Sequence, residues 1–369
     1  MIKIKKILLL FLFFLLTNLY SDSTLSERLN FAVQPPIFSP ASKTKLSGSE
    51  IVDKLKPILK KRISQTNYDR TFPIIQFIDY YNSLKKPPNN LSPIEVFKKF
   101  NFKPLLSNNR GGPCLTLTLD LIQYIPDELN AYICLAKLPT KYQQIAFPEY
   151  SHSAVLIRYV NPNNSRDSGF VLLDPSFDID EPILLEENQA PYYYDTKING
   201  IWKFYLEKDK IICEIIKEDS DVIDKMVYLT HKVTNPIESS AMPMLLVDRR
   251  LSLLSRKENG LHLAHLNVEL NKKRVIWDKD GTRFEPISFD QIKQGWTFPN
   301  WFSSNLFLEQ TELDNKINKI VNNKNIIDSL FFEYISLIKE TKDFSITGEI
   351  EIKKLDLILN QLDLEAFND

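Results

Sequence analysis

The chain has 369 residues, of which 43% are hydrophobic and 25% are charged. These proportions are typical of a folded protein with a large core and exclude an intrinsically disordered chain. The formal net charge of −1 gives no electrostatic basis for binding nucleic acid. The three cysteines are too few for a disulfide framework, and neither Cys-x-x-Cys nor His-Glu-x-x-His occurs, so we expect no metal site.

Residues 1–21 have the layout of a targeting segment. Lys3, Lys5 and Lys6 precede a ten-residue apolar run over 7–16, which is short for a membrane span. This pattern predicts a signal peptide and therefore an exported protein, secreted or periplasmic. The alternative is that the segment is not cleaved and anchors the chain in a membrane, which is the only membrane contact expected.

The next two regions differ in composition. Residues 22–48 mix Ser, Pro and Lys, which is typical of a linker. The spacing of apolar residues predicts helices over 49–113, which we interpret as a helical subdomain. One helix start is marked by Ser92 as N-cap, Pro93 in the first turn and Glu95 at the third helical position.

The stretch 110–114, Arg-Gly-Gly-Pro-Cys, is where we expect the chemistry. A pair of glycines allows tight backbone conformations and close approach by another group, so we expect Arg110, Gly111 and Gly112 to help bind the substrate. The following run over 115–122 alternates Leu and Thr, which indicates a strand, but its apolar spacing also fits a buried helix face. We favour the helix, which would place Cys114 at the positive end, where a thiolate is stabilised.

The remainder of the chain shows strand patterns and then helical ones. Apolar residues with period two predict an antiparallel sheet or barrel, and the spacing of apolar residues from Phe307 onward predicts C-terminal helices. The expected strands cover 131–136, 153–160, 169–173, 201–206, 211–216, 245–254, 261–270 and 274–277.

Three residues in this order could form an activated nucleophile. His152 follows Cys114 by 38 residues (152 − 114), and Asp174 follows His152 by 22 (174 − 152). A thiol, an imidazole and a carboxylate would act as the nucleophile, the base and the acid that orients the base. Cys134 and Cys213 lie within apolar runs, and we expect them to be ordinary core residues.

These motifs resemble those of the arylamine N-acetyltransferases. Arg-Gly-Gly-x-Cys at 110–114 is followed by a histidine some forty residues later and then by an acid after a strand. The likeness continues through the segments 234–240, 247–253 and 283–287. It spans about 50–295 and is strongest near the cysteine, histidine and acid.

The resemblance implies an α+β fold: a papain-like Cys-His-Asp core with an N-terminal helical subdomain, an antiparallel β-barrel and a C-terminal α/β lid. On that layout, residues 114–235 form the catalytic core with its barrel, and 236–369 form the lid and a helical tail. It also implies acetyl-CoA as co-substrate, no metal, and transfer of the acetyl group to an amine through a thioester on Cys114.

Three departures from the family's pattern leave other functions open. Thr116 stands where the family usually has an acid, an insertion covers 161–169, and Asp174 is followed by Pro-Ser-Phe, which is closer to the transglutaminase-like superfamily. An exported protein would not normally meet acetyl-CoA. The alternatives are a transglutaminase-like or papain-like amidase or protease acting on a small-molecule or peptide amide, a catalytically silent binding protein on the same fold, and a structural surface protein.

Overall fold

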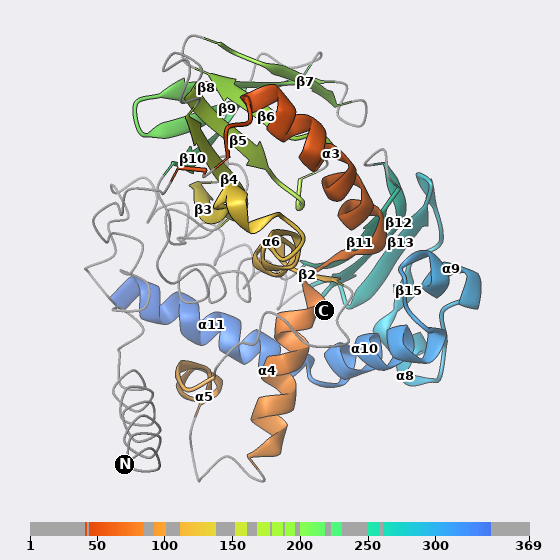
Figure 1. The fold of residues 1–369 in the computed structure, drawn as a ribbon. Coiled ribbons are helices and arrows are strands. Elements are labelled where there is room, and N and C mark those ends of the chain that lie inside the picture. The colour runs from red at the N-terminus through yellow and green to blue at the C-terminus, as the bar shows by residue number, and fades with distance from the viewer. Residues whose placement is uncertain are drawn as a thin grey trace, which may run out of the picture.

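The computed structural model has an α+β fold in which helices pack between and around two sheets (Figure 1). No helix among the residues that it describes is both long and apolar enough to cross a bilayer. The described residues are 41–42, 44–84, 92–100, 111–137, 152–160, 168–177, 179–186, 189–195, 200–217, 223–230, 250–257 and 261–340. The predicted signal peptide and Arg110 lie outside them.

An eight-stranded antiparallel sheet carries most of the middle of the chain. Its strand order is β6-β5-β4-β3-β10-β9-β8-β7, and it curls so that β6 comes close to β8. The predicted strand pairs are confirmed, because β4 pairs with β5 and β8 pairs with β9. The strands are β3 (Tyr132–Lys137), β4 (His152–Val160), β5 (Ser168–Leu173), β6 (Ile183–Glu186), β7 (Tyr192–Asp195), β8 (Gly200–Glu207), β9 (Lys210–Lys217) and β10 (Ile223–Leu229).

A seven-stranded sheet combines N-terminal and C-terminal segments. Its order is β14-β13-β12-β11-β1-β2, with β15 on β13. The edge pair β1 and β2 is parallel and was not predicted, because strands of three and two residues show no hydrophobic period. The strands are β1 (Asn67–Asp69), β2 (Gly111–Gly112), β11 (Arg250–Arg256), β12 (His262–Glu269), β13 (Arg274–Lys279), β14 (Thr282–Arg283) and β15 (Ile287–Ser288).

Several of the helices begin at a side-chain cap. Ser92 and Glu95 form the predicted capping box, and Ser47 and Glu50 form another. The predicted C-terminal helices are confirmed as α10 and α11. The helices are α3 (Gly48–Gln65), α4 (Thr71–Ser83), α5 (Pro93–Lys98), α6 (Cys114–Ile122), the 3-10 helix η2 (Asp127–Leu129), α8 (Phe289–Lys293), α9 (Asn300–Asn305), α10 (Gln310–Asn322) and α11 (Lys324–Glu340).

The N-terminal helices contribute to two different cores. Ile51, Leu55 and Leu59 of α3 are fully buried against the strands β4 and β5 of the eight-stranded sheet. In contrast, α4 and α5 pack with the seven-stranded sheet and with α8 to α11. The helix α6 lies where the two sheets meet (Figure 1). The domain boundaries at 113/114 and 235/236 stay predictions.

Candidate active site

The helix α6 begins at Cys114, as favoured from the sequence. Pro113 is the N-cap with an extended backbone, and the amide of Leu117 donates the first helical bond to the Pro113 carbonyl at 3.1 Å. The thiol of Cys114 is buried, with 1% of the residue exposed. It therefore lies at the helix end where the backbone dipoles favour a negative charge.

The Leu-Thr alternation of this helix follows from its burial on several sides. Leu115 belongs to the core under the seven-stranded sheet, whereas Leu121 packs in the core with α3 and β4. Thr118 is fully buried and donates to the Ser153 carbonyl of β4 at 3.1 Å. Six of its nine residues are buried and Leu119, Asp120 and Ile122 are half-buried, so the exposed polar face that marks a surface helix is absent.

The two glycines before the cysteine allow close packing of the chain on itself. A Cβ atom on Gly111 would lie 1.6 Å from Oδ1 of Asn67 and 2.2 Å from its carbonyl oxygen. A Cβ on Gly112 would lie 2.5 Å from the Cβ of Thr116. The space that the glycines leave is thus occupied by Asn67 of β1 and Thr116 of α6, and contact of either glycine with a substrate stays a prediction.

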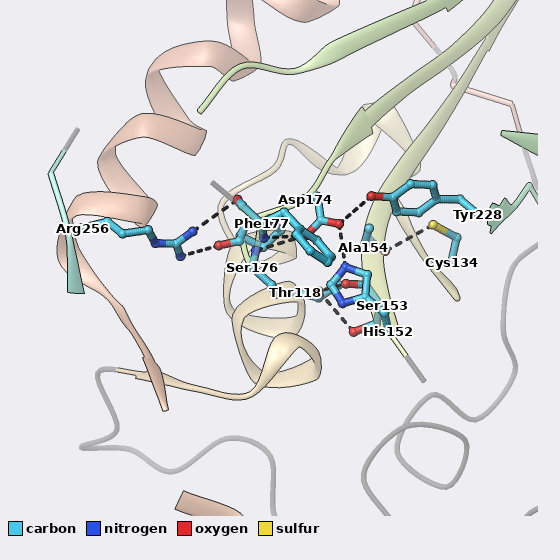
Figure 2. Close-up of polar contacts among 11 residues, drawn as sticks. Thr118, Cys134, His152, Ser153, Ala154, Asp174, Ser176, Phe177, Tyr228 and Arg256 are labelled. Carbon is cyan, nitrogen blue, oxygen red and sulfur yellow. Dashed lines mark hydrogen bonds and ion pairs between the residues drawn. The ribbon is translucent and has the colours of Figure 1, made fainter. Parts of the chain in front are cut away.

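His152 and Asp174 meet because β4 and β5 are antiparallel neighbours. His152 begins β4 and Asp174 follows the last residue of β5, so the pairing brings the two ends together. His152 Nε2 lies 2.6 Å from Asp174 Oδ2, and the two residues are 4% and 1% exposed. Figure 2 shows the imidazole directed at this carboxylate.

Four donors hold the carboxylate of Asp174. Oδ2 also accepts from the Tyr228 hydroxyl at 2.9 Å, while Oδ1 accepts from the amides of Ser176 at 3.1 Å and Phe177 at 3.2 Å (Figure 2). Burial, and then the charge of Asp174, raise the pKa of Tyr228 well above its ordinary value, so this hydroxyl stays a donor. No local sequence pattern marks Tyr228, because its partner lies 54 residues earlier.

The environment of His152 favours its protonated form. Burial lowers the pKa of His152, but the negative charges of Asp174 and Cys114 and hydrogen bonds to both side chains raise it to about 10. One of these causes is a side-chain hydrogen bond between the imidazole and Cys114. Because Nε2 faces Asp174, Nδ1 is the ring nitrogen left for the sulfur. The three predicted residues form one connected chain of polar contacts.

Aromatic rings enclose the imidazole. The rings of Phe177 and His152 meet edge to face with centroids 4.6 Å apart, and the ring of Trp202 packs edge to face on Phe177 at 5.4 Å. The ring of Tyr228 lies 6.3 Å from that of His152. Such apolar surroundings restrict the imidazole to one orientation and strengthen its electrostatic interaction with Asp174.

The remaining cysteines belong to the core, as expected. Cys134 and Cys213 are fully buried, and burial raises the pKa of both thiols. The Cys134 thiol donates to the Ala154 carbonyl at 3.6 Å. Across the described part of the chain, no group of three or more His, Cys, Asp or Glu side chains is placed to hold a metal ion.

Comparisons with known proteins found no matching family model and no matching curated protein. Solved structures similar to this chain include the arylamine N-acetyltransferase of Mycobacterium smegmatis, at 14% identity and a TM-score of 0.44, covering 79% of this chain and 94% of that one. The arylamine N-acetyltransferase of Salmonella typhimurium matches with a TM-score of 0.41 at 13% identity. The match covers 74% of this chain and 89% of that one. The Mycobacterium marinum enzyme in complex with CoA matches with a TM-score of 0.43 at 13% identity. The match covers 80% of this chain and 97% of that one.

Proposed function

We propose that the chain is a cysteine-dependent acyltransferase that moves an acyl group to an amine through a thioester on Cys114. The observation that supports this most strongly is the polar chain from Cys114 through His152 to Asp174, in which the last two side chains are 2.6 Å apart. All three residues are buried. A structural role for a buried Cys does not require a charged imidazole beside it.

In the proposed reaction the Cys114 thiolate attacks the acyl carbonyl carbon, and His152 carries the proton. The tetrahedral oxyanion is stabilised by backbone amides at the start of α6. The bond to the leaving group then breaks, His152 gives it a proton, and an acyl thioester remains on the sulfur. An amine attacks the thioester, His152 takes the amine proton, and the thiolate is released. Asp174 steadies the imidazolium.

The acyl donor and acceptor come from the sequence resemblance. It suggests acetyl-CoA as donor and an arylamine-like acceptor, whereas the predicted export of the chain favours a peptide or small-molecule amide outside the cytosol. Hydrolysis of such an amide would use the same thioester with water in place of the amine. The two reactions differ in the compound that acylates Cys114. Identifying that acyl donor therefore distinguishes them.

Intact mass spectrometry after incubation with three separate reagents tests the proposal. Acetyl-CoA, p-nitrophenyl acetate and a glutamine-containing peptide are each compared on the natural chain and on Cys114→Ser. Acetylation by acetyl-CoA, absent from Cys114→Ser, selects the acetyltransferase; an adduct with the peptide alone selects a transglutaminase-like or protease activity. No adduct at Cys114 with any reagent, in folded protein with a free thiol, contradicts a covalent acyl-enzyme.

A further inference from the structure

Arg256, at the end of β11, is a buried arginine that the proposed reaction does not use. Over 251–254 buried and half-buried residues alternate, as expected for a strand, but Ser255 and Arg256 are then buried in succession. The register shifts at this point: Ser255 pairs with Ala264 and Arg256 with His262, so β12 has one extra residue between the two pairs. This β-bulge, whose extra residue is on β12, disrupts the strand pairing at Arg256, and such bulges are common beside active sites.

The Arg256 side chain reaches the turn that follows Asp174, which belongs to the other sheet's side of the site. Arg256 is 1% exposed. Its Nη2 donates to the Pro175 carbonyl at 2.5 Å, and its Nη1 donates to the Phe177 carbonyl at 3.3 Å (Figure 2). A buried guanidinium is costly unless it is hydrogen-bonded, and its planar fork suits two acceptors held at a fixed separation.

The same turn is held from its inner side by Asp174. Oδ1 of Asp174 accepts from the amides of Ser176 and Phe177. The Arg256 guanidinium donates to the carbonyls of Pro175 and Phe177. Both main-chain polar groups of Phe177 are therefore fixed, and its ring lies against the imidazole of His152. The position of the turn therefore determines where the Asp174 carboxylate points and where the Phe177 ring packs against the imidazole.

We propose that Arg256 is a positioning residue that locks the turn after Asp174 and so keeps the carboxylate and the Phe177 ring aligned on His152. This inference rests on the proposed function, since alignment matters only if His152 works with Cys114. Arg256 would not touch the substrate. It joins the seven-stranded sheet to the site through two backbone carbonyls, without charge transfer or any covalent step.

The pKa of His152, measured by NMR titration of 13C-labelled histidine, separates positioning from simple stability. The chain has four histidines, so the His152 signal is assigned by its loss in His152→Ala. In Arg256→Met the carboxylate is freed from its aligned position, and we expect the pKa of His152 to fall by about one unit or more. The matched control is Arg274→Met, which removes an arginine of the same sheet whose Nε donates to Glu269 at 2.7 Å; it should leave the pKa unchanged.

Several results would overturn the role of Arg256. An unchanged pKa of His152 in folded Arg256→Met, or an equal fall in Arg274→Met, shows that the turn holds without this guanidinium. If Arg256→Met does not fold, Arg256→Lys keeps the charge and the apolar stem but cannot reach both carbonyls, so a smaller fall is expected and no fall contradicts the proposal. A natural chain in which His152 titrates near 6.5 contradicts the role of Arg256, because no raised pKa is then left for the turn to maintain, whereas the proposed function is decided separately by acylation of Cys114.

Discussion

His152 and Asp174 form a buried pair in which Nε2 and Oδ2 are 2.6 Å apart. The Tyr228 hydroxyl donates to the same oxygen, and the amides of Ser176 and Phe177 donate to Oδ1. A carboxylate with four fixed donors cannot rotate without losing several of them. The imidazole is therefore held with Nε2 toward Asp174 and with its other nitrogen available to Cys114.

The first prediction concerns the pH dependence of stability. The pKa of His152 in the folded protein, about 10, is above its ordinary value of 6.5, so folding binds a proton between these values. The stability that protonated His152 contributes is fully present below about pH 6.5 and is lost as the pH rises through 10. Urea unfolding at pH 6, 8 and 10 should therefore show the free-energy difference between the natural chain and His152→Gln shrinking as the pH rises. A constant difference would show that the imidazole is not protonated by folding.

The second prediction concerns the three polar residues acting as one unit. Cys114→Ala, His152→Ala and the double variant should each lose nearly the same activity, on the order of a thousandfold or more, because losses within a catalytic unit are not additive. Asp174→Asn should retain more, since it spoils the orientation of the base and leaves the nucleophile in place. Rates of acyl transfer to an aromatic amine measure this. Independent, additive losses would mean that the residues do not act together.

Which contacts of the site can be predicted from the sequence depends on how far apart the contacting residues are in the sequence. The order of Cys114, His152 and Asp174 and the pairing of two apolar strands were enough to predict which side chains meet. The contacts made by Tyr228 and Arg256 were not predictable, because their partners lie 54 and about 80 residues away and no local pattern marks them. The short strand of Gly111 and Gly112 escaped prediction for the same reason, since it is defined only by its pairing with Asn67 and Tyr68 of β1.

The third prediction concerns the packing of these glycines. Gly111→Ala should destabilise the protein by about 1–3 kcal/mol, since its Cβ would overlap the Asn67 side chain and its carbonyl oxygen. Adding Asn67→Ala should not restore stability, because the carbonyl, 2.2 Å from the new Cβ, stays in place. Thermal unfolding of Gly111→Ala, Asn67→Ala and the double variant measures both effects. Full recovery in the double variant would mean that the backbone contact is not limiting.

The fourth prediction concerns export. The basic start and apolar run of residues 1–21 predict removal of this segment and a mature chain that begins near residue 22. N-terminal sequencing of the protein recovered from its natural source, after separation of cytosolic from exported material, measures this. A full-length chain in the cytosol would reject export and remove the conflict with acetyl-CoA as donor. A full-length chain in the membrane fraction would support the uncleaved anchor.

An activated thiol at Cys114 would be much more reactive than the thiols of the other two cysteines. Cys114, Cys134 and Cys213 are all at most 1% exposed, so accessibility in the folded chain does not distinguish them. Peptide mapping after brief treatment of folded protein with iodoacetamide near pH 7 gives the three rates. We predict that Cys114 reacts far faster than Cys134 and Cys213, and that His152→Ala removes the difference. Equal, slow modification of all three cysteines in the natural chain would show that the Cys114 thiol is not activated.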